Sequence, residues 1–171
     1  MIRLLRPLLG DRRAVAAIEF ALVLPVMVML CLGTFEASRA VQAKMKASNA
    51  AQVMADLIAA QNAVVAADLT NYCNGAKLTM APYSQAALQA AIASVTNGTL
   101  DWHDESCGSA TAISSPTTVA TTLSGGSGNS VIIVQTTYTY SATLVYMLPA
   151  SITMTQFAYS RPRNVTTVAK N

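Results

Sequence analysis

Charged side chains are scarce in this chain. Lys, Arg, Asp and Glu together make up 11% of its 171 residues, and hydrophobic residues make up 53%. A typical soluble protein carries about 25% charged residues. This shortage argues against an ordinary water-soluble chain and indicates that part of it lies in an apolar solvent. The net charge is only +3, and four of the basic residues fall within the first 13 positions. We therefore expect no nucleic-acid partner.

Histidine and the usual catalytic motifs are also nearly absent. His103 is the only histidine, and because a metal centre needs several suitable ligands, we expect no metal site and no cofactor. The chain has no Gly-x-Ser-x-Gly or His-Glu-x-x-His motif, and its glycine-rich stretch at 124–130 lacks the Lys-Ser/Thr of a phosphate-binding loop. The acidic residues within Asp101–Glu105 could help His103 act in an anchored hydrolase, but such clusters are more often solvated surface. We expect no catalytic residues and no small-molecule substrate.

One apolar run, residues 14–35, dominates the N-terminal part. Its 22 residues include a single charged one, Glu19, and a helix of about 20 residues spans a hydrocarbon core of about 30 Å. A cleaved secretory signal is the main competing interpretation, but its apolar region would be only about 7–15 residues long. Basic residues precede the run and Glu36 follows it. The positive-inside rule then predicts a cytoplasmic N-terminus and an exported remainder.

Glycine and proline are missing from Thr34 to Asn74, a stretch rich in good helix formers. The membrane helix is therefore predicted to continue without a break to about Ala67. We expect four parts, which are a basic cytoplasmic leader (1–14), a transmembrane helix (15–35), an exported continuation of that helix (36–67) and a small exported domain (68–171).

The exported domain is predicted to combine a short helix with an antiparallel sheet. Asn71, Asn74 and Gly75 indicate a turn. A helix is expected to begin at Pro82 or Ser84 and to end at Asn97-Gly98, with Leu88, Ala91, Ile92 and Val95 on one face. A polar, irregular stretch is expected from Thr99 to Asn129, with a weak strand at 117–123.

Two further strands complete this α+β fold. Apolar and polar residues alternate from Ile132 to Tyr146, as strands favour. In the next run Ile152 and Met154 share one phase whereas Phe157 and Tyr159 share the other, which predicts a β-bulge near residues 155–156. A long helix covering a small antiparallel sheet is an α+β pattern that several small folds share.

The chain has three cysteines. Cys31 lies in the apolar run, where it is most simply a small apolar residue. Cys73 and Cys107 are expected to be exported, and an oxidising compartment favours a disulfide between them. Two free thiols are the alternative.

Glu19 is the most informative residue of the membrane segment. A carboxylate in the apolar core costs at least about 2.5 kcal/mol, so it normally has a partner or a function. The simpler explanation is that Glu19 lies near the cytoplasmic interface and reaches out to water or stays protonated. Its context, RRAVAAIEFALVLPVMVMLCLGTFEASRAV, resembles the N-terminus of TadE/TadG-like proteins, the pseudopilins and minor pilins of tight-adherence type IV pili. The similarity extends through Asp56-Leu57 and into residues 66–84.

The resemblance implies that a prepilin peptidase removes the leader by cutting between Ala14 and Val15. Ala14 stands where the family usually has glycine. Glu19 and Phe20 would then be the fifth and sixth residues of the mature chain. The Glu19 carboxylate could pair with the new α-amino group of Val15 on a neighbouring subunit, and this would help to insert or register subunits during assembly.

These features predict a non-catalytic minor pilin or pseudopilin, with a small pilin-like exported domain, that takes part in assembling a tight-adherence type IV pilus. Expected partners are membrane lipid, the prepilin peptidase, other pilin or pseudopilin subunits and the pilus assembly platform. The protein would be a single-pass component of a bacterial inner membrane with its C-terminal domain in the periplasm, or outside the cell within the pilus. The alternative is an uncleaved membrane-anchored scaffold or binding component of the same apparatus.

Overall fold

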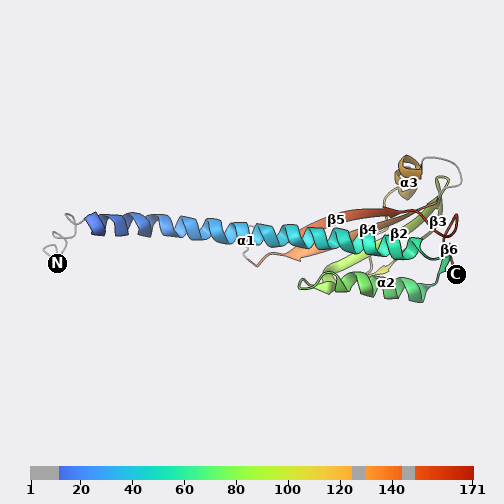
Figure 1. Ribbon diagram of the computed structural model, residues 1–171, viewed down its shortest axis with the longest axis horizontal. Helices are drawn as coiled ribbons and strands as arrows, with labels where there is room; N and C mark the ends of the chain where they lie inside the picture. Colours follow the sequence, from blue (N-terminus) through green and yellow to red (C-terminus); the bar gives the residue numbers. More distant parts are fainter. Residues whose placement is uncertain (1–11, 125–129, 144–148) are drawn as a thin grey trace.

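A single long helix, α1 (Arg12–Ala59), forms the axis of the molecule (Figure 1). The computed structural model describes residues 12–124, 130–143 and 149–171. The 48 residues of α1 correspond to a length of about 72 Å. Its N-terminal part projects away from the rest of the protein, whereas its C-terminal part packs against a small head (Figure 1). Pro25 is accommodated within this helix.

The predicted continuation of the helix to Ala67 is wrong, because α1 ends at Ala59. The last carbonyl groups of a helix lack partners within it, and here residues from the C-terminal segment supply them. The Arg163 backbone N–H donates to the Ala59 carbonyl at 3.0 Å, and the Asn164 side-chain amide donates to the Ala60 carbonyl at 2.9 Å. The chain then reverses through a short strand, β1 (Ala63–Val64), which pairs in parallel with β6 (Ala169–Lys170).

The second helix, α2 (Ala66–Leu78), occupies the region for which a turn was predicted. Asn71, Asn74 and Gly75 all lie inside it, so that prediction is wrong. The Asp68 carboxylate accepts a hydrogen bond from the Val65 backbone N–H at 3.1 Å and thereby satisfies one donor at the start of the helix. The buried face of α2 packs in the same core as α1.

Four antiparallel strands form the main sheet, in the order β3-β2-β4-β5. The strands are β2 (Leu88–Thr96), β3 (Thr99–Cys107), β4 (Ser130–Ser141) and β5 (Ser151–Ser160). The helices α1 and α2 share a core with one face of the sheet, and α3 (Pro116–Ser124) packs on the other face. A one-turn helix, η2 (Gln85–Ala87), leads into β2. The predicted α+β fold, with a long apolar helix and a small head, is confirmed.

Three of the predicted elements in the head have the wrong type. The helix expected from Pro82 or Ser84 is largely strand β2, which lies between two neighbours and is buried on both faces. Asn97 and Gly98, with φ values of 54° and 77°, form the two-residue turn of the β2–β3 hairpin instead of a helix cap. The stretch expected to be irregular contains β3 and α3, and the weak strand predicted at 117–123 is helical.

The strand predicted from Ile132 is confirmed as β4, which ends at Ser141. The predicted strand continued to Tyr146, and residues 144–148 lie outside the described residues. The predicted bulge near residues 155–156 is wrong, because β4 and β5 pair without a register shift. Phe157 and Tyr159 therefore lie on the opposite face from buried Ala158, and each remains 44% exposed.

Small side chains allow α1 to approach the sheet closely. The face of α1 within the core is largely alanine, and these alanines are almost fully buried: Ala40, Ala43, Ala47, Ala50, Ala51, Ala55 and Ala59. The buried Thr136 hydroxyl on β4 donates to the Ala47 carbonyl at 3.0 Å. The helix is therefore fixed to the sheet along the whole length of the head.

Candidate functional site

The apolar N-terminal part of α1 is the first component of the candidate site. Among the described residues, one helix is long and apolar enough to cross a membrane, and the window that meets this criterion is not buried by any other part of the protein. Large apolar side chains such as Leu22, Val26 and Leu30 are 57–72% exposed. So wide an exposed apolar surface needs lipid or other helices around it. The structure is therefore compatible with a single-pass membrane anchor.

Glu19 and Phe20 lie on this exposed part of the helix. Phe20 is 61% exposed and Val15 is 44% exposed. The Ala14–Val15 bond lies in the first turn of α1, and Val15 precedes Glu19 by four residues. Residues at this spacing share a helix face. The predicted cleavage point and the predicted pairing residues are thus adjacent at the end of α1 that is remote from the head.

A buried carboxylate at the junction between anchor and head was not predicted. Glu36 is 1% exposed, and its Oε1 accepts hydrogen bonds from the Thr143 backbone N–H at 2.8 Å and from the Tyr140 hydroxyl at 2.7 Å. These donors, Thr143 first, lower the pKa of Glu36. Burial and the bond to Glu36 raise the pKa of Tyr140 to about 12. The only signal in the sequence was an acidic residue directly after the apolar run, which was used for orientation alone.

Arg39 lies one turn above Glu36 on α1 and contacts one of the same partners, Thr143, which follows the end of β4. Its guanidinium donates to the Thr143 hydroxyl at 3.1 Å and lies 6.0 Å from the centre of the Phe35 ring. Among the described residues, Arg39 and Glu36 are not within ion-pair distance of each other. The junction is therefore held by hydrogen bonds from α1 to Tyr140 on β4 and to Thr143 just after it, not by a direct ion pair.

The acidic run around His103 does not form a single site. Asp101 accepts hydrogen bonds from the Ser94 and Thr96 hydroxyls, whereas Asp104 accepts one from Lys170 at 2.8 Å. Burial alone would raise the pKa of Asp104, but hydrogen bonds from Lys170 and Ser106 outweigh it and lower the pKa.

Within this run, His103 meets only Glu105, through Nδ1 at 2.8 Å. The side chains of His103 and Glu105 are 58% and 28% exposed. Among the residues that the structure describes, no three His, Cys, Asp or Glu side chains are grouped as metal ligands would be. Within the described residues, His103 is therefore not part of a catalytic triad.

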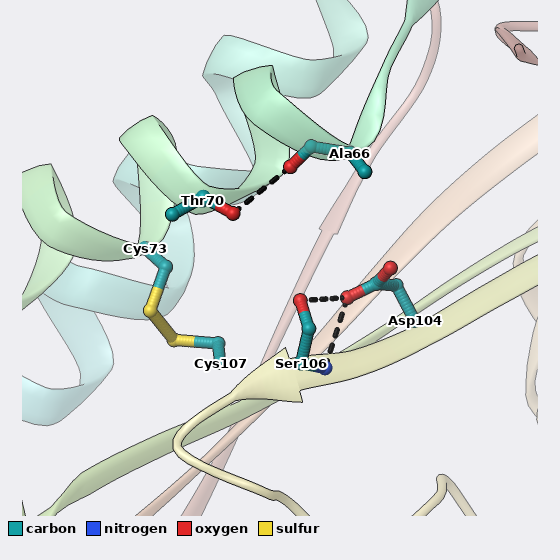
Figure 2. Close-up of a disulfide and its surroundings, with 6 residues drawn as sticks. All are labelled: Ala66, Thr70, Cys73, Asp104, Ser106 and Cys107. Carbon is teal, nitrogen blue, oxygen red and sulfur yellow. Dashed lines mark hydrogen bonds between the residues drawn. A yellow bond between two sulfur atoms is a disulfide. The ribbon is translucent and has the colours of Figure 1, made fainter.

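The disulfide between Cys73 and Cys107 is present in the structure. Figure 2 shows that it joins α2 to the end of β3. Both cysteines are almost fully buried. Beside it, the Asp104 carboxylate accepts hydrogen bonds from the backbone N–H and the hydroxyl of Ser106 (Figure 2). Cys31, in the apolar span, is free and exposed.

Comparison with known proteins gives one match. No curated protein and no solved structure matches the chain. The family model described as TadE-like protein matches residues 14–56. This range begins at the predicted cleavage point, includes Glu19, Phe20 and Glu36, and ends close to the C-terminus of α1. The match confirms the resemblance to the TadE-like family over residues 14–56, which is most of α1.

Proposed function

We propose that this chain is a non-catalytic minor pilin or pseudopilin that takes part in assembling a tight-adherence type IV pilus. One observation carries the proposal. A lone carboxylate, Glu19, sits beside Phe20 on an exposed apolar helix, inside the segment that matches the TadE-like family. A helix exposed on every side is suited to packing against the helices of other subunits as well as against lipid.

The proposed mechanism uses the new N-terminus of the mature chain. A prepilin peptidase on the cytoplasmic side hydrolyses the Ala14–Val15 bond and leaves an α-amino group on Val15. In the apolar core an unpaired Glu19 carboxylate is unfavourable by at least about 2.5 kcal/mol. Pairing it with the Val15 ammonium of a neighbouring subunit offsets part of this cost, and the pairing sets the relative height of the two helices.

The head moves together with α1 because hydrogen bonds join the two at several points along the helix. Glu36 binds Tyr140 and Thr143 at the base of the head, and Thr136 binds Ala47 in the middle. Asp56 accepts a hydrogen bond from Ser160 near the far end. A change in the height of the helix in the membrane is therefore transmitted directly to the periplasmic domain and to the subunits that contact it.

Substitution of Glu19 tests this proposal. Glu19→Gln keeps the size of the side chain but removes its charge, and we expect the variant to reach the membrane yet fail to assemble with other subunits. Met27→Gln is the matched control, because it places the same amide at another exposed position of the span. Co-purification with pilus subunits and recovery of pili from sheared cells are the measurements. Normal assembly of Glu19→Gln would contradict the pairing mechanism.

A second function is favoured by Ala14, which stands where the family usually has glycine. If the peptidase does not accept alanine, the leader stays attached and the protein acts as a permanently anchored scaffold of the apparatus. An Ala14→Gly variant separates the two functions. Under the scaffold function, only this variant loses its leader, whereas under the pilin function the natural chain loses it too.

A further inference from the structure

A pocket lies at the base of the head, where α1 leaves the apolar span. Its volume is about 220 Å³, which leaves room for several water molecules at about 30 Å³ each. Arg39 on α1 lines it, together with residues 82–84 and the end of β4. None of the predicted site residues belongs to this pocket.

The position of the pocket along α1 places it at the surface of the membrane. Residues 15–35 form a helix of about 31 Å, close to the roughly 30 Å of a hydrocarbon core. Arg39 follows Phe35 by four residues, which is about 6 Å along the axis. The polar head-group layer occupies about 5–7 Å on each side of the hydrocarbon. The guanidinium of Arg39 is therefore level with the lipid phosphates.

Arg39 supplies the chemistry that a phosphate group needs. A guanidinium carries five N–H donors and is always charged, and it suits bidentate contacts with phosphate. The hydrogen bond to the Thr143 hydroxyl uses one of these donors and holds the side chain near the segment that follows β4. The carboxylate of Glu36 is the nearby opposing charge, but the Thr143 N–H and the Tyr140 hydroxyl both donate to it. Its negative charge is thus partly compensated without Arg39.

Two tyrosines form an ordered wall of the pocket. The rings of Tyr83 and Tyr140 meet edge to face, with their centres 6.2 Å apart. The Tyr140 hydroxyl is bound to Glu36, and the Tyr83 hydroxyl donates to the Gln42 side chain at 3.3 Å. Tyrosine is enriched at the membrane–water interface, where its ring contacts the apolar side and its hydroxyl stays in the polar layer.

We propose that this pocket binds the phosphate-bearing head group of a phospholipid from the leaflet on the side of the head. The guanidinium of Arg39 contacts the phosphate, and the partly exposed Tyr83 ring lies beside the head group. The bound lipid would fix the height and tilt of the head above the membrane. This inference rests on the membrane anchoring in the proposed function, but not on cleavage or pilus assembly.

The test uses the full-length protein, purified in a detergent without phosphate and titrated with single lipids in native mass spectrometry. Phosphatidylglycerol is compared with diacylglycerol, which lacks the phosphate, and inorganic phosphate is used as a competitor. We expect phosphatidylglycerol to bind at least about tenfold more tightly than diacylglycerol, because a charge-assisted hydrogen-bonded contact is lost. Inorganic phosphate at millimolar concentration should not displace the lipid.

Arg39→Gln is the critical variant, and Lys44→Gln is its matched control. Lys44 is an exposed cation on the same helix that does not line the pocket. We expect Arg39→Gln to lose at least about tenfold in phosphatidylglycerol affinity, whereas Lys44→Gln keeps the affinity of the natural chain. An intact Cys73–Cys107 disulfide in the mass spectrum shows that each variant has folded.

Three results would overturn the inference. Equal affinity of the two lipids would show that the phosphate is not recognised, and equal losses in both variants would show that general charge is responsible. Displacement by inorganic phosphate would make free phosphate the ligand. Flotation of the natural chain with vesicles is measured in parallel. Failure to float would instead contradict the membrane anchoring itself.

Discussion

The disulfide between α2 and β3 offers the most quantitative test of the fold. Cys73 and Cys107 are 34 positions apart, and cross-linking a loop of this length should stabilise the folded head by about 3–4 kcal/mol in the loop-entropy model. Replacing both cysteines with alanine removes the cross-link and leaves small apolar residues at two buried positions. We expect the free energy of unfolding of the head to fall by that amount.

Trp102 makes the assay selective for the head. It is the only tryptophan in the chain, and its indole N–H donates to the Val168 carbonyl at 2.7 Å within the head. Its fluorescence should therefore follow unfolding of the head in urea while the span of α1 stays in detergent. With a urea slope of about 1–3 kcal/mol/M, the midpoint should drop by roughly 2 M.

Cys31→Ala is the control for this experiment, because Cys31 is exposed in the span and is not bonded to another cysteine. Its midpoint should equal that of the natural chain. A drop of less than about 0.3 M in the double variant would refute the argument that the bridge stabilises the head through its loop.

Three further changes probe the packing of the head and its charges. The lowered pKa of Glu36 means that its contribution to stability is fully present above its ordinary pKa of 4.5 and is lost as the pH falls through the lower folded value. The protection of the Thr143 amide against hydrogen exchange, measured relative to its intrinsic rate at each pH, should therefore fall in acid, and in Glu36→Gln this acid-dependent change should be absent. Ala47→Leu should destabilise the head by about 1–3 kcal/mol because the fully buried position has no room for the larger side chain, whereas a neutral result in urea unfolding would argue against close packing of α1 on the sheet. The lowered pKa of Asp104 likewise gives stability that is present above about pH 3.8 and is lost below it. Asp104→Asn should lower the free energy of unfolding by about 1–3 kcal/mol at neutral pH. In this variant the urea midpoint should also change less as the pH falls through the acid range.

The anchor could be predicted from the sequence because its signal is long and simple. A run of 22 residues with a single charge has few other structures available. Glu19 and Phe20 then gave a motif at a fixed distance from Ala14. The end of α1 at Ala59 was not predictable from local sequence, because Arg163 and Asn164 cap it from more than 100 positions away.

The head was harder to predict because its local preferences conflict with its packing. Strand β2 reads LQAAIASVT, and its alanines and single apolar residues fit a helix period as well as a strand period. Its place in the middle of the sheet, with both faces buried, decides the outcome. In α3 the opposite happened: β-branched Thr and Val suggested a strand, although Pro116 at the first helical position was a usable start signal.

Phe157 and Tyr159 misled the prediction for a different reason. The change of phase between Ile152/Met154 and Phe157/Tyr159 predicts a bulge only if both pairs of side chains are buried on one face of the sheet. In the structure β5 keeps its register, and the two rings stack on each other at the surface, 6.3 Å apart. The buried position of Glu36 was not predictable from local sequence either, because its partners Tyr140 and Thr143 lie more than 100 positions further along the chain.

The identity of the mature N-terminus tests the central proposal most directly. The full-length gene product should be isolated from membranes and from sheared pili of a cell that contains the prepilin peptidase, and its intact mass should be measured. A pilin or pseudopilin is predicted to begin at Val15, and the same chain should stay uncut when the peptidase is deleted. Recovery of Met1 in every molecule, in membranes and pili alike, would contradict the account.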